Sequence, residues 1–102
     1  MDYKYLADQL DMDETEFLEL VALFVDTTRT DLKKIRQGVS CGDFSRAAAA
    51  AHSIKGAAGN LGFTRMADLA RKMETAANGA SFENFDAYIT DLETRVDALI
   101  PT

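Results

Sequence analysis

The sequence predicts an all-α protein, an antiparallel four-helix bundle with a short additional N-terminal helix. Apolar residues recur at spacings of three and four along most of the chain, which is the period of a helix with one buried face. No segment alternates apolar and polar residues for long enough to predict a strand. Gly38, Gly42 and Gly79 separate the periodic segments, and short connections favour antiparallel neighbours.

The first helix is short. Tyr3, Leu6, Ala7 and Leu10 have the spacing of one amphipathic face, and we expect the helix to end near Asp11. A helix of this length is marginal alone, so it should pack against the rest of the chain.

A long second helix is expected from the N-cap Asp13 to the residue before Gly38. Glu16 follows Asp13 by three residues, as in a capping box, and acidic side chains are favourable in a first turn. Basic residues fill the expected last turn. One mostly apolar stripe runs along this helix: Phe17, Leu20, Val21, Phe24, Thr28, Leu32 and Ile35.

The third and fourth helices are also bounded by residues with strong local preferences. The third is expected to start around Gly42 and Asp43 and to run through the alanine block 47–51. Thr64 is expected to cap the fourth helix, and Gly79 follows its end. The predicted core side of the fourth helix consists of Met66, Leu69, Ala70, Met73 and Ala77.

A fifth helix completes the predicted bundle. Ser81 is expected to cap it and Pro101 to stop it. Its apolar stripe consists of Phe85, Tyr88, Ile89, Leu92, Val96 and Leu99.

Length and composition place narrow bounds on the kind of protein. A chain of 102 residues, 47% of them hydrophobic, suits one globular domain over residues 1–102. The chain lacks the ~20-residue apolar run of a membrane span and the order of a signal peptide, so a cytoplasmic protein is expected. A lone Cys41 excludes an internal disulfide and a cysteine-ligated metal site.

The net charge of -6 is unevenly distributed. Residues 1–28 carry eight acidic side chains and one basic one, and residues 73–102 carry six acidic side chains and one basic one. Residues 29–72 carry nine basic side chains against three acidic ones. This balance disfavours nucleic acid as a partner of the whole molecule but leaves a basic region that could meet an acidic surface.

The segment FSRAAAAAHSIKGAAGNLG, residues 44–62, contains the only histidine, His52. In an unbroken helix, one arc forms the core face: Phe44, Ala47, Ala51, Ile54, Ala58 and Leu61. His52 then points outward. Within about 60° of it, on the outer face that we predict to dock a partner, lie Ser45, Ala48, Ala49, Lys55, Gly56 and Gly59.

Gly56 and Gly59 are unexpected inside a helix. Each costs about 1 kcal/mol relative to alanine, in a segment that otherwise uses alanine freely. One explanation is that they end the helix or allow close packing within the bundle. We favour the other explanation, in which they expose the imidazole and let another macromolecule approach the helix.

An exposed imidazole beside a cation is suited to phosphoryl transfer. Histidine is a competent nucleophile at neutral pH, and Lys55, three residues after His52, could bind phosphoryl oxygens. Such transfer depends mainly on positioning and charge neutralisation.

The segment HSIKGAAGNLG, residues 52–62, resembles the signature of histidine-containing phosphotransfer (HPt) domains of two-component phosphorelays. That signature is His, any residue, Leu or Ile, Lys, Gly, two small residues, and then a nearby aliphatic residue and Gly. Residues 17–35 are similar to the long helix before the signature, and residues 69–74 to the segment after it.

The resemblance implies a role for each site residue. His52 would accept a phosphoryl group on its outward ring nitrogen from a receiver-domain phospho-aspartate and pass it to another receiver aspartate. Lys55 would stabilise the phosphoryl oxygens, and Gly56 and Gly59 would give steric room for docking. The expected partners are response-regulator receiver domains, a hybrid sensor histidine kinase, or both. The receiver supplies its own magnesium, so no cofactor or metal is expected here.

Other functions are compatible with the same residues. An autonomous, ATP-using kinase is disfavoured because the chain has no glycine-rich nucleotide loop and no room for an ATP-binding domain. An HPt-like first domain of a chemotaxis-type histidine kinase has a similar His-Ser-Ile-Lys-Gly segment and remains an alternative. A helical adaptor that is never phosphorylated is another. A monomer is expected, because every apolar stripe can be used inside one bundle.

Overall fold

The computed structural model describes residues 3–99, and five helices lie within this range. No strand occurs in this range, so the predicted all-α class is confirmed. The helices are α1 (Tyr3–Gln9), α2 (Glu14–Cys41), α3 (Phe44–Leu61), α4 (Thr64–Asn78) and α5 (Phe85–Asp97).

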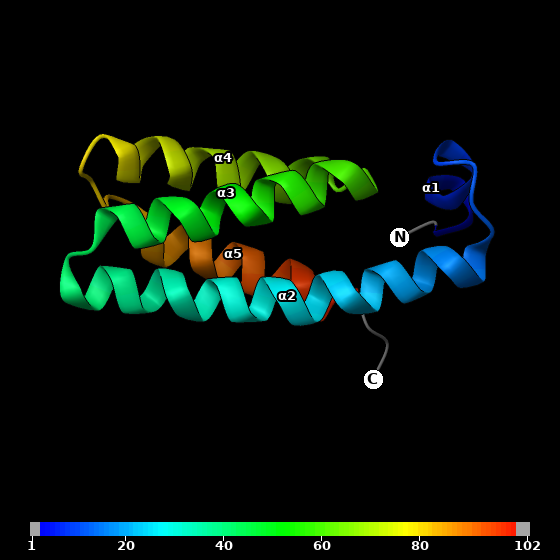
Figure 1. Cartoon of the computed structure of the whole chain (residues 1–102), viewed down its shortest axis with the longest axis horizontal. Helices are drawn as coiled ribbons and strands as arrows, with labels where there is room; N and C mark the ends of the chain where they lie inside the picture. The colour runs from blue at the N-terminus through cyan, green and yellow to red at the C-terminus, as the bar shows by residue number, and fades with distance from the viewer. Residues whose placement is uncertain (1–2, 100–102) are drawn as a thin grey trace.

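The four longer helices form the bundle, and each runs in the opposite direction to the one before it (Figure 1). α3 packs against both α4 and α2, while α1 packs near the beginning of α2 (Figure 1). None of the helices in the described range is long and apolar enough to cross a membrane. Pro101, predicted to stop the last helix, lies outside the described residues.

Two aspartates begin the helices that build the site, as predicted. The side chain of Asp13 accepts a hydrogen bond from the backbone N–H of Glu16 at 2.8 Å. Asp43 accepts one from the backbone N–H of Arg46 at 3.0 Å. Both carboxylates satisfy N–H groups that have no partner within their own helix.

The predicted end of α2 before Gly38 is wrong. The helix continues to Cys41, and Gly42 caps it in the left-handed conformation, with φ of 71°. Gly38 is buried inside the helix, and a Cβ built on it would lie 2.9 Å from the carbonyl oxygen of Asp43. Gly38 therefore allows the start of α3 to approach α2 closely.

Two predicted caps are also wrong. Thr64 is the first residue of α4, and the N-cap is Phe63, whose ring is buried against α2. Ser81 accepts a hydrogen bond from the backbone N–H of Glu83, whereas α5 begins only at Phe85. The start of α4 thus follows the burial of the Phe63 ring, and Ser81 belongs to a local turn before α5 rather than to a helix cap.

The core follows most of the predicted stripes, with two exceptions among the leucines. Leu10 is 39% exposed because α1 ends at Gln9 and the following turn takes Leu10 off the helix face. Leu20 is 38% exposed and borders a groove beside the C-terminal end of α3. The largest fully buried side chains include Phe17, Phe85, Ile35, Ile54, Leu69, Met73 and Leu92.

Candidate functional site

α3 carries the predicted site without a break. The helix continues through Gly56 and Gly59 to Leu61, so neither glycine ends it. Gly62 ends it in the left-handed conformation, with φ of 83°, and donates to the carbonyls of Ala58 and Gly59. One unbroken helix therefore carries all the predicted site residues in a fixed register.

His52 points outward, as predicted. Its side chain is 66% exposed, whereas Ile54, near the opposite side of the helix, is fully buried. The alanines on the core side of α3 let this helix lie close to its neighbours without covering the imidazole.

One ring nitrogen of His52 is held by Glu74 of α4. The distance from Nδ1 of His52 to Oε2 of Glu74 is 2.7 Å, and the Glu74 side chain is only 18% exposed. An ionised carboxylate accepts hydrogen bonds but cannot donate one, so Nδ1 carries the proton of this contact. In the neutral ring, the lone pair is then on Nε2, the nitrogen that Glu74 does not bind.

Glu74 also binds the predicted cation. Nζ of Lys55 donates to Oε1 of Glu74 at 2.7 Å, so one carboxylate joins His52 and Lys55. The hydrogen bond from Lys55 is the main reason why the pKa of Glu74 lies below its ordinary value. The contact with His52 acts in the same direction, whereas burial opposes both.

Gly56 and Gly59 leave open space on the same helix. A Cβ built on either would have no neighbouring atom within 4 Å. The explanation that these glycines allow packing inside the bundle is therefore wrong, in contrast to Gly38. The surface around His52 is open because glycine has no side chain beyond Cα at these two positions.

Among the small residues predicted to face outward, Ser45 and Ala49 are exposed and Ala48 is not. Ala48 is 7% exposed, so its predicted place on the docking surface is wrong. Helical rotation places Ala48 on the same side of His52 as Lys55, which reaches toward α4. That side of α3 is covered by α4, and Ala48 packs there.

Sequence reasoning missed Glu74 as a site residue, although a signal for it exists. Residues equally far from the turn of an antiparallel helix pair lie opposite each other. His52 and Glu74 are each eleven residues from Phe63, in the turn between α3 and α4. Pairing residues across this turn would have identified the carboxylate.

Two exposed leucines of α2 were also missed as candidate surface residues. Leu23 is 62% exposed, and with Leu20 it lines a groove of about 310 Å³. Ala57 and Asn60 of α3 line the other side of this groove. Because Asn60 lies next to Gly59, the groove continues the bare face around His52 toward α2.

The Glu74 contacts predict a pH dependence of stability. Because the pKa of Glu74 is lower in the folded chain than in the unfolded chain, its contribution is complete above the ordinary pKa of 4.5. That contribution is lost as the pH falls through the lower, folded-state pKa. We expect Glu74→Gln to reduce the acid-induced loss of unfolding free energy, measured by denaturant titration at several pH values from neutral to acidic.

Glu83→Gln is the matched control for this experiment, because Glu83 makes no ion pair within residues 3–99. An identical pH profile for wild type and Glu74→Gln would contradict the role of these contacts in stability.

The fold and the site together define a helical bundle that presents one histidine, oriented by a carboxylate from the adjacent helix, on a bare surface. The family model described as Hpt domain matches residues 19–100, and the chain belongs to this family. Hpt domains are histidine phosphotransfer modules of phosphorelays, and they are phosphocarriers rather than kinases. Comparison with curated proteins finds no match, and neither does comparison with solved structures.

Proposed function

We propose that this chain accepts a phosphoryl group on Nε2 of His52 from the phospho-aspartate of a receiver domain and passes it to another receiver aspartate. The observation that carries the proposal is the environment of the His52 ring: Glu74 binds Nδ1, and the side chain is 66% exposed. This arrangement leaves Nε2 as the nitrogen available for attack.

The proposed transfer conserves charge and needs no further reactant. The Nε2 lone pair attacks phosphorus, the bond from phosphorus to the aspartyl oxygen breaks, and the aspartate carboxylate leaves with the electron pair. The proton stays on Nδ1, so the ring becomes positively charged beside the Glu74 carboxylate at 2.7 Å. Glu74 would stabilise that charge and hold the ring in one orientation, as a positioning residue.

Lys55 supports the same step from the other oxygen of Glu74. Its side chain is 36% exposed and lies on the side of α3 that carries the imidazole. A phosphoryl group on Nε2 would attract this ammonium and compete with Glu74 for it. Lys55 would thus neutralise charge on the group being transferred.

Lys55→Ala is therefore expected to slow transfer by about tenfold, the loss of one charge-assisted hydrogen bond, without preventing folding. The measurement is the rate of phosphoryl uptake from a phosphorylated receiver, together with the helical circular dichroism. Lys72→Ala is the control, because Lys72 pairs with Asp68 away from the imidazole. Equal rates for Lys55→Ala and wild type would remove Lys55 from the site.

The docking face that we propose for the receiver combines two helices. It contains the exposed α3 residues and the two leucines that the structure adds: Ser45, Ala49, His52, Gly56, Gly59, Leu20 and Leu23. Its apolar side suits a partner surface of similar character, as in the centre of protein interfaces. The basic excess of residues 29–72 complements the acidic pocket around a receiver aspartate.

The deciding experiment mixes the full chain with a purified, phosphorylated receiver domain. A gain of one phosphoryl group in intact mass, lost after acid treatment, supports phosphohistidine. An acid-stable gain would place the group on a hydroxyl such as that of Ser53 and would overturn the proposal.

A second arm offers ATP and the ATP-binding domain of a chemotaxis-type kinase. Labelling in this arm alone would make the chain the phosphoacceptor domain of such a kinase. Binding to receivers without any labelling would make it an adaptor.

A further inference from the structure

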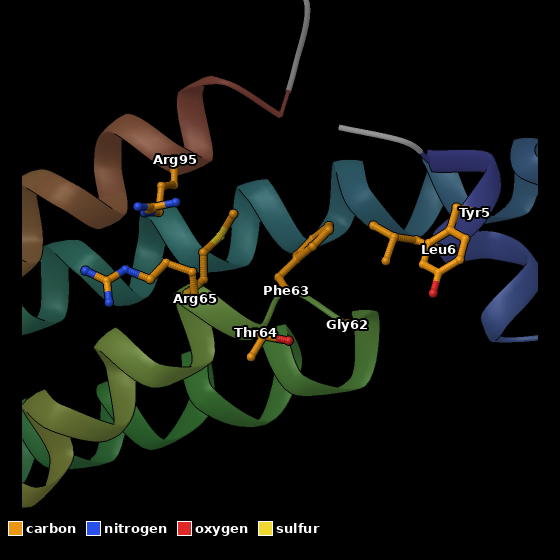
Figure 2. Close-up of a pocket in the computed structure, with 8 residues that line it drawn as sticks. Tyr5, Leu6, Gly62, Phe63, Thr64, Arg65 and Arg95 are labelled. Atoms are coloured by element: carbon orange, nitrogen blue, oxygen red, sulfur yellow. The ribbon is translucent and has the colours of Figure 1, made fainter.

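A separate cavity lies at the end of the bundle, away from the imidazole. It has a volume of about 290 Å³ and lies where α1, the turn between α3 and α4, and α5 meet (Figure 2). His52 is ten residues before Gly62, one of the lining residues, which corresponds to about 15 Å along the helix. The cavity therefore lies away from the imidazole, and it shares no lining residue with the proposed docking face.

The inner wall of the cavity is apolar and fixed. Phe63 and Met66 are 4% and 3% exposed. The half-buried Leu6 of α1 faces Phe63 from the other side (Figure 2). The Phe63 ring packs edge-on against Phe24, with a centroid distance of 5.3 Å. Because core packing holds this wall, the cavity exists before any ligand arrives.

Two arginines stand at one end of the cavity, Arg65 of α4 and Arg95 of α5 (Figure 2). They share one carboxylate: Asp91 lies 2.7 Å from Nε of Arg95 and 3.5 Å from Nη2 of Arg65. Asp68 lies 3.8 Å from Arg65 but is bound more closely by Arg71, at 2.6 Å. Among residues 3–99, two guanidinium groups thus share one carboxylate at this rim, which leaves positive charge in excess there.

We propose that this cavity binds a small amphiphilic carboxylate, that is, an apolar chain or ring bearing one carboxylate group. The apolar part would lie on Phe63 and Met66, and the carboxylate would accept from the N–H groups of Arg65 and Arg95 that Asp91 does not bind. Charge complementarity favours this class of ligand. The excess positive charge would repel a cation, and a neutral apolar molecule would leave that charge unpaired. The first turn of α4, which no side chain caps, adds partial positive charge at the same place.

The experiment titrates octanoate into the isotopically labelled full chain and follows the backbone amide resonances. We expect saturable shifts at Gly62, Thr64 and Met66. Arg95→Gln and Arg65→Gln should each weaken binding by about tenfold, which corresponds to ~1.4 kcal/mol. Arg46→Gln changes an exposed arginine of α3 that does not line the cavity and contacts Gln37, and it should bind as wild type does. Octan-1-ol should bind about tenfold more weakly than octanoate.

Several outcomes would overturn the proposal. One is the absence of saturable shifts, and another is equal binding of octanoate and octan-1-ol. A third is equal weakening by Arg46→Gln, which would indicate general attraction to basic side chains. Shifts of the same amides with protein concentration alone would show that a second copy of the chain fills the cavity. Competition between octanoate and a receiver domain would assign the cavity to receiver docking.

Discussion

His52→Gln is expected to take up no phosphoryl group from a phosphorylated receiver domain. The glutamine amide nitrogen has no available lone pair, so the attacking atom is lost rather than weakened. The unfolding free energy should change by no more than about 0.5 kcal/mol, because the His52 side chain is 66% exposed. Intact mass after incubation measures uptake, and thermal unfolding followed by circular dichroism measures stability.

Ser53→Ala is the control for His52→Gln, since Ser53 is the adjacent exposed residue with a hydroxyl group. It should be labelled as wild type is. Labelling of His52→Gln at the wild-type level, or loss of labelling in Ser53→Ala, would contradict the assignment of His52 as the acceptor.

Gly59→Leu is expected to slow transfer by about ten- to a hundredfold while making the fold more stable by about 1 kcal/mol. Leucine is a much better helix former than glycine, and a Cβ at residue 59 meets nothing within 4 Å, so folding improves. A partner that packs on the bare helix would meet the new side chain instead, and overpacking of this kind costs ~1–3 kcal/mol. Transfer rates against receiver concentration and the melting temperature test the two effects.

Two alanine variants separate helix propensity from packing in this experiment. Gly59→Ala should also raise the melting temperature, with a smaller effect on transfer. Gly38→Ala should lower it, because its Cβ would lie 2.9 Å from the carbonyl oxygen of Asp43. A lowered melting temperature for Gly59→Leu would show that the glycine serves internal packing, and an unchanged transfer rate would remove Gly59 from the docking face.

The helices and the outward direction of His52 could be predicted because both follow from rotation within one helix. The 3.6-residue period assigns each residue of α3 to a side of the helix, and the core residues Ala51, Ile54 and Ala58 define which side is buried. The same reasoning identified Lys55, Gly56 and Gly59 as neighbours of the imidazole. None of these predictions needs the position of another helix.

The features that sequence analysis missed depend on how helices pack side by side. Ala48 and Ala49 are adjacent in the sequence, yet α4 covers only Ala48. In the sequence, Glu74 cannot be told from an ordinary exposed glutamate. Only the packing of α4 against α3 brings it to His52. Gly38 was predicted to end α2, because the sequence does not show that the backbone at the start of α3 packs closely against it.

The turn between α3 and α4 has a consequence for how this chain could vary. Gly62 and Phe63 connect α3 and α4. The length of this connection determines which residue of α4 lies opposite His52, and here that residue is Glu74. One inserted amino acid would turn α4 by about 100° relative to α3 or shift it by about 1.5 Å. Loops usually tolerate such insertions. Here an indel of a single codon would separate His52 from Glu74 while every side chain of the site was retained.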